Sequence, residues 1–277
     1  MFKFRIIGFT LLIALLGGIF FWKTGGIWLF LAAAPALCAA AAGEFAKMLN
    51  DSGRSAFPVP TALLVWIIII GALMPGIPSL LLMQWFFPLL IIAAFAGMLA
   101  MKPKIMEGVL TSFGVMVLMT LPLTLLLATY FIRPLGFWLL FICLVTKATD
   151  TGGYIVGTLT AKLPGGNHKI APGISPKKSW EGLAGGMVLS LAAAWGFYRF
   201  GGMDIPLMWC LLSGVVLSLG SFFGDLTESA IKRFCGVKDS GSFVPGMGGA
   251  FDVLDSFLYN GILFWILYST LLWDGWK

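Results

Sequence analysis

The chain has 277 residues, of which 59% are hydrophobic and only 11% are charged, and its mean hydropathy is +0.97. A soluble domain carries about 25% charged residues, so this composition excludes a protein whose whole surface faces water. The net charge of +6 would favour a nucleic-acid partner in a soluble protein. Here no basic stripe alternates with aromatic residues, so we expect no nucleic acid and attribute the charge to membrane orientation and an anionic ligand.

Apolar runs long enough to cross roughly 30 Å of hydrocarbon recur along the chain. They predict an all-α integral membrane protein, a polytopic helical bundle of about nine transmembrane helices. The expected spans are 4–22, 26–43, 58–74, 79–100, 109–131, 135–148, 183–200, 206–224 and 249–273. We expect five N-terminal spans in residues 1–131. Residues 132–277 then form a catalytic region with two cytoplasmic active-site loops, 145–182 and 224–256.

The basic residues are distributed unevenly between the two sides of this bundle. Of the 18 Lys and Arg residues, nine spans place 14 on the side of the N-terminus. The other side has only four, Lys23, Arg133, Arg199 and Lys277. The positive-inside rule therefore predicts a cytoplasmic N-terminus and an extracytoplasmic C-terminus. The first run could also be a secretory signal peptide, but it is long and lacks a small-x-small cleavage site, so we expect an uncleaved span.

The segment 224–256 combines carboxylates with cations. If residues 225–233 continue the eighth span as a helix, Asp225, Ser229 and Lys232 share one face with Glu228. Such a stripe suits a metal-bridged phosphate, because the carboxylate binds the ion and the cation neutralises the oxyanion. The alternative is a solvated juxtamembrane helix with a Glu228–Lys232 pair.

Asp252 and Asp255 lie three residues apart at the start of the last apolar run, on one face of a helix. A charged side chain at membrane depth costs roughly 2.5–3.5 kcal/mol on insertion scales, so the two need a compensating partner. Mg²⁺ is such a partner, since it takes hard oxygen ligands and often only one or two carboxylates together with substrate phosphates. A helix-cap role for Asp252, or pairing with Lys232 or Arg233, is the alternative.

Two glycines, Gly248 and Gly249, precede this run. Glycines let backbone N–H groups approach an anion closely, although a tight turn before a span would also explain them.

The first loop contains a Ser-Pro-Lys-Lys run. Ser175 is expected to be an N-cap with proline at the first helical position. Lys177 and Lys178 would then lie in the first turn, where cations are unfavourable unless an anion binds nearby. Ordinary positive-inside lysines are the alternative. The single histidine, His168, is expected to be a surface residue or a phosphate contact rather than an essential base.

Together these residues resemble the phosphatidate cytidylyltransferases, also called CDP-diacylglycerol synthases. The family signature reads Ser-x-x-Lys-Arg, four residues, Lys-Asp, then Pro-x-His-Gly-Gly, two residues, Asp-Arg-x-Asp. The residues that match it in register are Ser229, Lys232, Arg233, Lys238, Asp239, Pro245, Gly248, Gly249, Asp252 and Asp255. Upstream, Asp150, Tyr154 and residues 169–182 also resemble the family, so the resemblance covers roughly 145–260.

The chain departs from the signature at two positions. Met247 stands where the usual signature has histidine, and Val253 where it has arginine. Met247 cannot accept a proton, so that histidine cannot be an obligate base here. The missing arginine removes one phosphate contact. Because the carboxylates of the signature are all present, we still expect an active enzyme.

The resemblance implies that CTP and phosphatidic acid give CDP-diacylglycerol and pyrophosphate, in phospholipid biosynthesis at the cytoplasmic face of a bacterial inner (plasma) membrane. Mg²⁺ is the expected cofactor; a second, monovalent cation and a homodimer are left open. The implied metal ligands are Asp225, Asp252 and Asp255, with Asp239 in support. Lys232, Arg233 and Lys238 would neutralise the triphosphate. The implied substrate-binding residues are Asp150, Ser175, Lys177, Lys178, Ser229, Gly248 and Gly249.

Three other classes remain open at this stage. A CTP-dependent polyprenol or phytol kinase has a similar membrane site but transfers the γ-phosphoryl group. A CDP-alcohol phosphotransferase needs a longer Asp-rich helix motif, which this sequence lacks. A transporter would also carry charged residues within spans, but it would leave the Ser-Pro-Lys-Lys and Gly-Gly elements unexplained.

Overall fold

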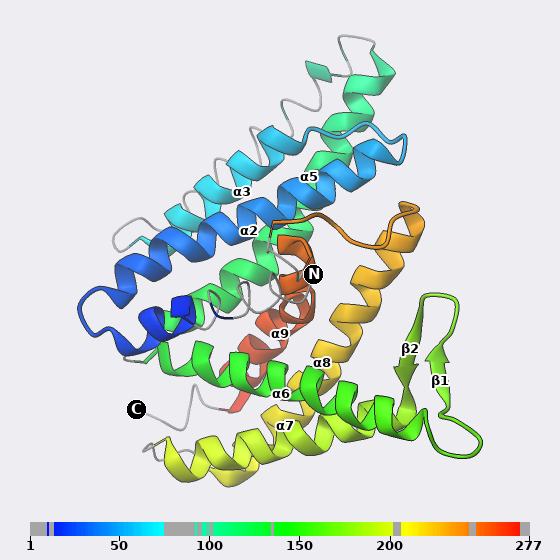
Figure 1. The fold of residues 1–277 in the computed structure, drawn as a ribbon. Helices are drawn as coiled ribbons and strands as arrows, with labels where there is room; N and C mark the ends of the chain where they lie inside the picture. The colour runs from blue at the N-terminus through cyan, green and yellow to red at the C-terminus, as the bar shows by residue number, and fades with distance from the viewer. Residues whose placement is uncertain are drawn as a thin grey trace. The chain divides into compact units, whose positions relative to one another are not determined.

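The computed structural model describes residues 10, 14–74, 92, 96–97, 99, 102–133, 136–201, 206–243 and 248–271. Most of the expected span 79–100 and part of the expected span 4–22 lie outside these residues. The described elements are α2 (Gly26–Asp51), α3 (Pro58–Leu73), α5 (Pro103–Ala128), η1 (Thr129–Phe131), α6 (Phe137–Thr160), β1 (Lys169–Ala171), β2 (Ser175–Ser179), α7 (Trp180–Phe200), α8 (Leu207–Phe234) and α9 (Ala250–Leu271) (Figure 1).

Six helices in this part of the chain are long and apolar enough to cross a membrane. They are α2, α5 continued through η1, α6, α7, α8 and α9. The shorter α3 is also apolar but has only 16 residues. The expectation of a polytopic helical membrane protein is confirmed at this level. The all-α expectation is confirmed as well. The described residues add one small antiparallel hairpin, formed by β1 and β2.

The chain divides into two compact units. The first comprises Met1–Ala128 and Lys232–Leu254, and the second comprises Thr129–Ile231 and Asp255–Lys277. The division near residue 129 falls close to the expected boundary after residue 131. The end of α8 and the start of α9 belong to the first unit, together with the N-terminal helices. The expected division into 1–131 and 132–277 had placed both in the C-terminal region.

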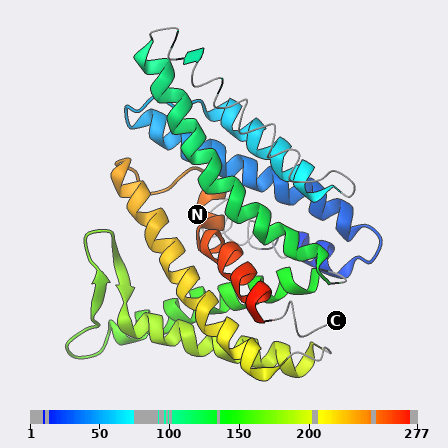
Figure 2. The ribbon, with the colours of Figure 1, turned by 180° about the vertical axis from the view of Figure 1, so that it is seen from behind.

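In the first unit, α2, α3 and α5 lie side by side, as both views of the ribbon show (Figures 1 and 2). Their contact faces are made of aliphatic residues, and Val65, Ile69, Val115 and Leu123 are almost completely buried. Burial of each such side chain contributes roughly 1.5–3 kcal/mol in an aqueous reference. In lipid that driving force is small, so close packing itself holds such helices together.

In the second unit, α6 and α7 pack against each other through small residues. A Cβ added at Gly152 would meet the carbonyl oxygen of Gly185 and the side chain of Leu189. A Cβ added at Gly186 would meet the carbonyl oxygen of Thr149 at 2.8 Å. Small residues on facing helices allow the backbones to approach closely, which is how helices associate in lipid.

The expected helix start at Ser175 is wrong. Residues Ser175–Ser179 form β2, which pairs with β1 so that Lys169 lies opposite Ser179 and Ala171 opposite Ser175. The N-cap is Ser179, whose hydroxyl accepts a hydrogen bond from the Gly182 amide at 3.1 Å. Lys177 and Lys178 therefore project from a strand and not from the first turn of a helix.

The expected loop boundaries also change. The helix α6 continues to Thr160, so residues 145–160 are helical and not the start of a loop. The conditional expectation for 225–233 is confirmed, because α8 runs on to Phe234 and keeps Asp225, Ser229 and Lys232 on one helix. Two long helices thus carry the polar residues beyond the apolar stretches.

The close α6–α7 contact predicts different effects of the same substitution at two glycines of α7. Gly186→Ala should lower the free energy of unfolding by about 1–3 kcal/mol, because the new methyl group overpacks the contact. Gly196 has no atom within 4 Å of an added Cβ, so Gly196→Ala should be neutral or slightly stabilising. Thermal unfolding of both variants in one detergent measures the difference, and equal melting temperatures would contradict the packing described.

Candidate active site

The β1–β2 hairpin is fixed to the ends of α6 and α7 by polar contacts. The Asn167 side-chain amide donates to the Gly157 carbonyl oxygen at 2.8 Å and to the Ser179 hydroxyl at 3.2 Å. Glu181 accepts hydrogen bonds from the His168 amide, and its Oε1 lies 2.6 Å from His168 Nδ1. Because His168 is engaged with Glu181 and 86% exposed, its surface position is confirmed.

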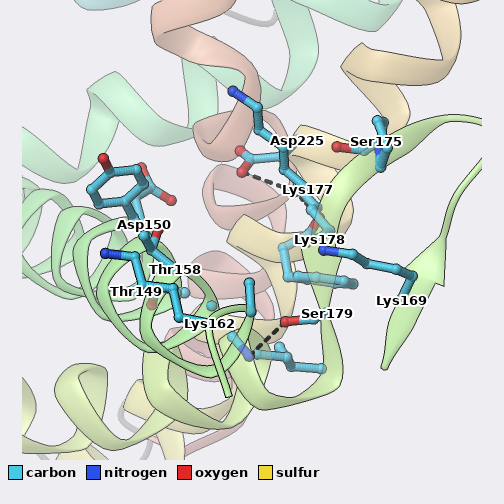
Figure 3. A pocket seen from close by; sticks show the side chains of 18 residues that line it. Thr149, Asp150, Thr158, Lys162, Lys169, Ser175, Lys177, Lys178, Ser179 and Asp225 are labelled. Atoms are coloured by element: carbon cyan, nitrogen blue, oxygen red, sulfur yellow. Dashed lines mark hydrogen bonds and ion pairs between the residues drawn. The ribbon is translucent and has the colours of Figure 1, made fainter. Parts of the chain in front are cut away.

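A cavity of about 510 Å³ lies between this hairpin, α6, the start of α7 and α8 (Figure 3). It brings together five of the residues that the sequence indicated for the site, namely Asp150, Ser175, Lys177, Lys178 and Asp225. Lys162 and Lys169 also line it. Four lysines against two aspartates leave the lining positive, so the cavity is suited to an anion.

Lys178 and Asp225, which both line this cavity, form an ion pair. The Lys178 ammonium donates to Asp225 Oδ2 at 2.9 Å and to the Phe222 carbonyl oxygen at 3.1 Å (Figure 3). Both side chains are mostly buried, with 18% and 28% of their surface exposed. A strand and a transmembrane helix are therefore joined by a charge-assisted bond at the cavity wall.

Asp150 is held on the same wall by two donors. The Ser221 hydroxyl donates to Oδ1 at 2.9 Å, and the Lys147 ammonium donates to Oδ2 at 2.9 Å. Asp255 lies close enough to interact electrostatically with Asp225, Lys147 and Asp150, and it accepts hydrogen bonds from the amide and hydroxyl of Ser256. Three carboxylates and two lysines of the second unit thus interact within a mainly apolar unit, and one carboxylate is left in excess of the lysines.

In the first unit, Asp252 lies at the centre of a second polar cluster. The Lys232 ammonium donates to Oδ1 at 3.0 Å, and both side chains are only 12% exposed. The Gly249 amide donates to Oδ2 at 2.8 Å, and the Ser240 amide donates to both oxygens at 3.2–3.3 Å. The structure therefore shows both alternatives for Asp252, the pair with Lys232 and a contact that caps the start of α9.

Glycine is required at two positions of this cluster. Gly248 has a φ of +106°, and a Cβ there would meet the Asp252 carboxylate. A Cβ at Gly249 would meet both Ser240 Oγ and Glu44 Oε2. The two glycines let the loop before α9 pass directly against two carboxylates.

The other signature residues that the structure describes differ in exposure. Arg233, Lys238 and Asp239 are exposed, whereas Ser229 is half-buried on α8. The Arg233 guanidinium donates to the Val237 carbonyl oxygen at 3.3 Å, which holds the turn after α8. Met247 lies outside the described residues, and Val253 is half-buried in the first turn of α9.

The sequence did not single out three residues that the structure places in the cavity or in the cluster around Asp252. Lys162 and Lys169 line the cavity but had been counted only as positive-inside residues or as part of the resemblance. Glu44 of α2 accepts hydrogen bonds from Ser240 and Phe251. The available signal for Glu44 was a single carboxylate next to the second apolar run, and an ionisable residue within a span is a functional candidate by default.

The donor chemistry fits a magnesium ion held partly by substrate. Asp225 and Asp255 supply hard carboxylate oxygens within one unit, and Asp225 faces the cavity. Among the described residues, no group of three or more His, Cys, Asp or Glu side chains is arranged to hold a metal ion. Mg²⁺ commonly uses one or two carboxylates and completes its shell with water and phosphate oxygens. The arrangement suits that mode better than an all-protein cage.

Comparison with known proteins identifies the family to which the chain belongs. Residues 3–271 match the model of the cytidylyltransferase family. A phosphatidate cytidylyltransferase of Bacillus subtilis is 43% identical over 122 residues, which are 44% of each chain. The enzyme of that name from Mycobacterium tuberculosis is 40% identical over 134 residues, or 48% of this chain and 39% of that protein. The aligned part thus spans less than half of either relative. Since the family model covers nearly the whole sequence, the chain belongs to the cytidylyltransferase family.

Proposed function

We propose that this protein is a CTP:phosphatidate cytidylyltransferase, which converts CTP and phosphatidic acid to CDP-diacylglycerol and pyrophosphate. The observation that carries the proposal is the positive cavity beside the hairpin, which gathers Lys162, Lys169, Lys177 and Lys178 around Asp225. Relatives that carry this activity in their names support it over the kinase and transporter alternatives.

Transfer of a cytidylyl group needs little covalent chemistry from the protein. The phosphate monoester of the lipid attacks the α-phosphorus of CTP, the new P–O bond forms, and pyrophosphate leaves. A phosphate monoester has a second pKa near 6, so its oxygen is already ionised at neutral pH and needs no strong base. Catalysis then rests on positioning and on charge neutralisation.

The lysines of the cavity have distinct parts in this proposal. Lys177 is exposed on the hairpin and Lys178 is mostly buried beside Asp225, so Lys177 meets an incoming phosphate first. Lys178 then exchanges part of its interaction with Asp225 for a phosphate oxygen. In the first unit we assign Lys232, Arg233 and Lys238 to neutralisation of the triphosphate.

Mg²⁺ is the proposed cofactor, and it would polarise the phosphate and offset charge on the leaving group. Within the second unit we propose Asp225 and Asp255 as its ligands. For Asp252 of the first unit we also propose cation binding, with Asp239 in support. Asp225 and Asp255 lie in the second unit and Asp252 in the first. Before a cation binds, Lys178 and Lys232 neutralise Asp225 and Asp252.

The finer membrane arrangement is part of the proposal. We propose nine spans, with the active-site loops at the cytoplasmic face of a bacterial inner membrane. The support is the 14-to-four distribution of the 18 Lys and Arg residues between the two sides. A homodimer is compatible with this arrangement and is not required by it.

The position of a radioactive label tests the reaction. Purified protein in detergent with phosphatidic acid and Mg²⁺ should transfer ³²P from α-labelled CTP to a lipid product. From γ-labelled CTP it should release the label as pyrophosphate. Lipid labelled from γ-CTP would instead indicate a kinase, and flux into proteoliposomes without a product would indicate a transporter.

A matched pair of variants connects that reaction to the cavity. Lys178→Met should lower turnover by about 10²-fold if its charge acts in the transition state, at the magnitude found for loss of one such donor. Lys102→Met, the same change at an exposed lysine of the first unit, should leave turnover unchanged.

The orientation can be measured with reporter fusions. A periplasm-active alkaline phosphatase fused to the C-terminus should be active, and a fluorescent protein that matures only in the cytoplasm should stay dark. The reverse result would mean that the number of spans is even or that the orientation is inverted, and the proposed arrangement would then be abandoned.

A further inference from the structure

One carboxylate of α2, in the first unit, contacts the segment between α8 and α9, which we call the signature loop. Glu44 Oε2 accepts a hydrogen bond from the Ser240 hydroxyl at 3.0 Å and another from the Phe251 amide at 3.1 Å. These bonds join α2 to residues nearly 200 positions further along the chain, since the separations are 196 and 207. Glu44 lies within α2, one of the helices long and apolar enough to cross a membrane.

The start of α9 explains why an outside acceptor is needed there. The first amides of a helix have no partner within the helix, and an N-cap side chain normally accepts from the second or third of them. The residue before Ala250 is Gly249, which has no side chain to do so. Glu44 supplies the missing acceptor at Phe251 from a different helix.

Asp252 completes the arrangement from within α9. Its carboxylate reaches back to the Gly249 amide at 2.8 Å, as the acidic residue of a capping box does. Ser240 then joins the two carboxylates, because its amide donates to Asp252 and its hydroxyl to Glu44. Asp252 and Glu44 thus hold the same short segment from two sides.

The Glu44 carboxylate is closely surrounded by neighbouring residues, so it can adopt few other positions. An added Cβ at Gly241 or at Gly249 would meet the Glu44 carboxylate. The neighbouring Phe45 stacks on Phe251 with ring centroids 5.0 Å apart, and both rings are almost fully buried. The carboxylate and the ring together fix the register of α2 against the first turn of α9.

We propose that Glu44 is a positioning residue, which caps α9 from outside and thereby holds Asp252 and the glycine loop in place. Its catalytic consequence rests on the proposed function, whereas its structural effect does not. Glu44 itself touches neither nucleotide nor metal in this proposal. It acts through Asp252, Ser240 and Gly249.

The chain offers a closely matched control. Glu107 of α5 also accepts hydrogen bonds from a serine, at 3.2 Å from the Ser55 amide and at 3.1 Å from the Ser55 hydroxyl. It therefore bonds the same two kinds of donor in the same unit, but not in the signature loop. Glu107→Ala and Glu107→Gln remove the same charge without touching α9.

Hydrogen–deuterium exchange of the purified protein tests the structural part. In Glu44→Ala, peptides that cover residues 238–252 should exchange faster than in the wild type, and in Glu107→Ala they should not. If Glu44→Ala fails to fold, Glu44→Gln serves instead, with a smaller increase because the amide oxygen still accepts. Unchanged exchange in folded Glu44 variants would overturn the proposal.

Steady-state kinetics test the catalytic part. Glu44→Ala should lower kcat by about 10²-fold, the scale expected from a displacement of roughly 1 Å, with KM for CTP changed much less. Glu44→Gln should recover part of kcat, and both Glu107 variants should match the wild type. Faster exchange with normal kcat would overturn the positioning role. A wild-type protein without cytidylyltransferase activity would instead count against the proposed function and leave the exchange result standing.

Discussion

An ionised side chain within a membrane-spanning helix needs a partner, because charge is expensive in a medium that cannot solvate it. This constraint organises the polar part of the molecule. Lys178 pairs with Asp225, Lys147 with Asp150, and Lys232 with Asp252, each at 2.9–3.0 Å. The sequence contains only 11% charged residues. Five of the six side chains in these pairs lie on the mainly apolar helices α6, α8 and α9, and Lys178 lies on β2. The cost of placing them there is the physical reason to look for function in them.

Two of the pairs join groups that the proposed reaction needs. Lys178 and Lys232 neutralise Asp225 and Asp252, which are proposed to bind a cation, and the two carboxylates neutralise lysines that are proposed to meet phosphate. Arrival of a magnesium–triphosphate complex would exchange one set of opposite charges for another. Glu44 has a different role in our proposal, because it holds the loop around Asp252 in place and does not contact the substrate itself.

Local patterns predicted the helices well and the hairpin badly. The i, i+4, i+7 stripe from Asp225 to Lys232 required only that α8 continue, and it does. Ser175-Pro176 fits a helix N-terminus, but a residue before proline also favours an extended backbone. Because β2 pairs with β1, residues Ser175–Ser179 form a strand and not the start of a helix. The Glu44 bonds span about 200 residues, so no local pattern could have indicated them.

The dependence of turnover on Mg²⁺ in Asp225→Asn and Asp252→Asn tests the central claim most directly. The wild type should lose activity in EDTA and regain it with Mg²⁺. Each variant should lose at least roughly 10²-fold in turnover, about 2.7 kcal/mol in the barrier. The melting temperature should fall, because asparagine keeps one accepting oxygen but leaves Lys178 or Lys232 without its ion-pair partner. Turnover is therefore compared at a temperature where wild type and variants are all folded. Full turnover without a divalent cation, or near-normal rates in both variants, would contradict the claim that these carboxylates are retained to hold a metal ion.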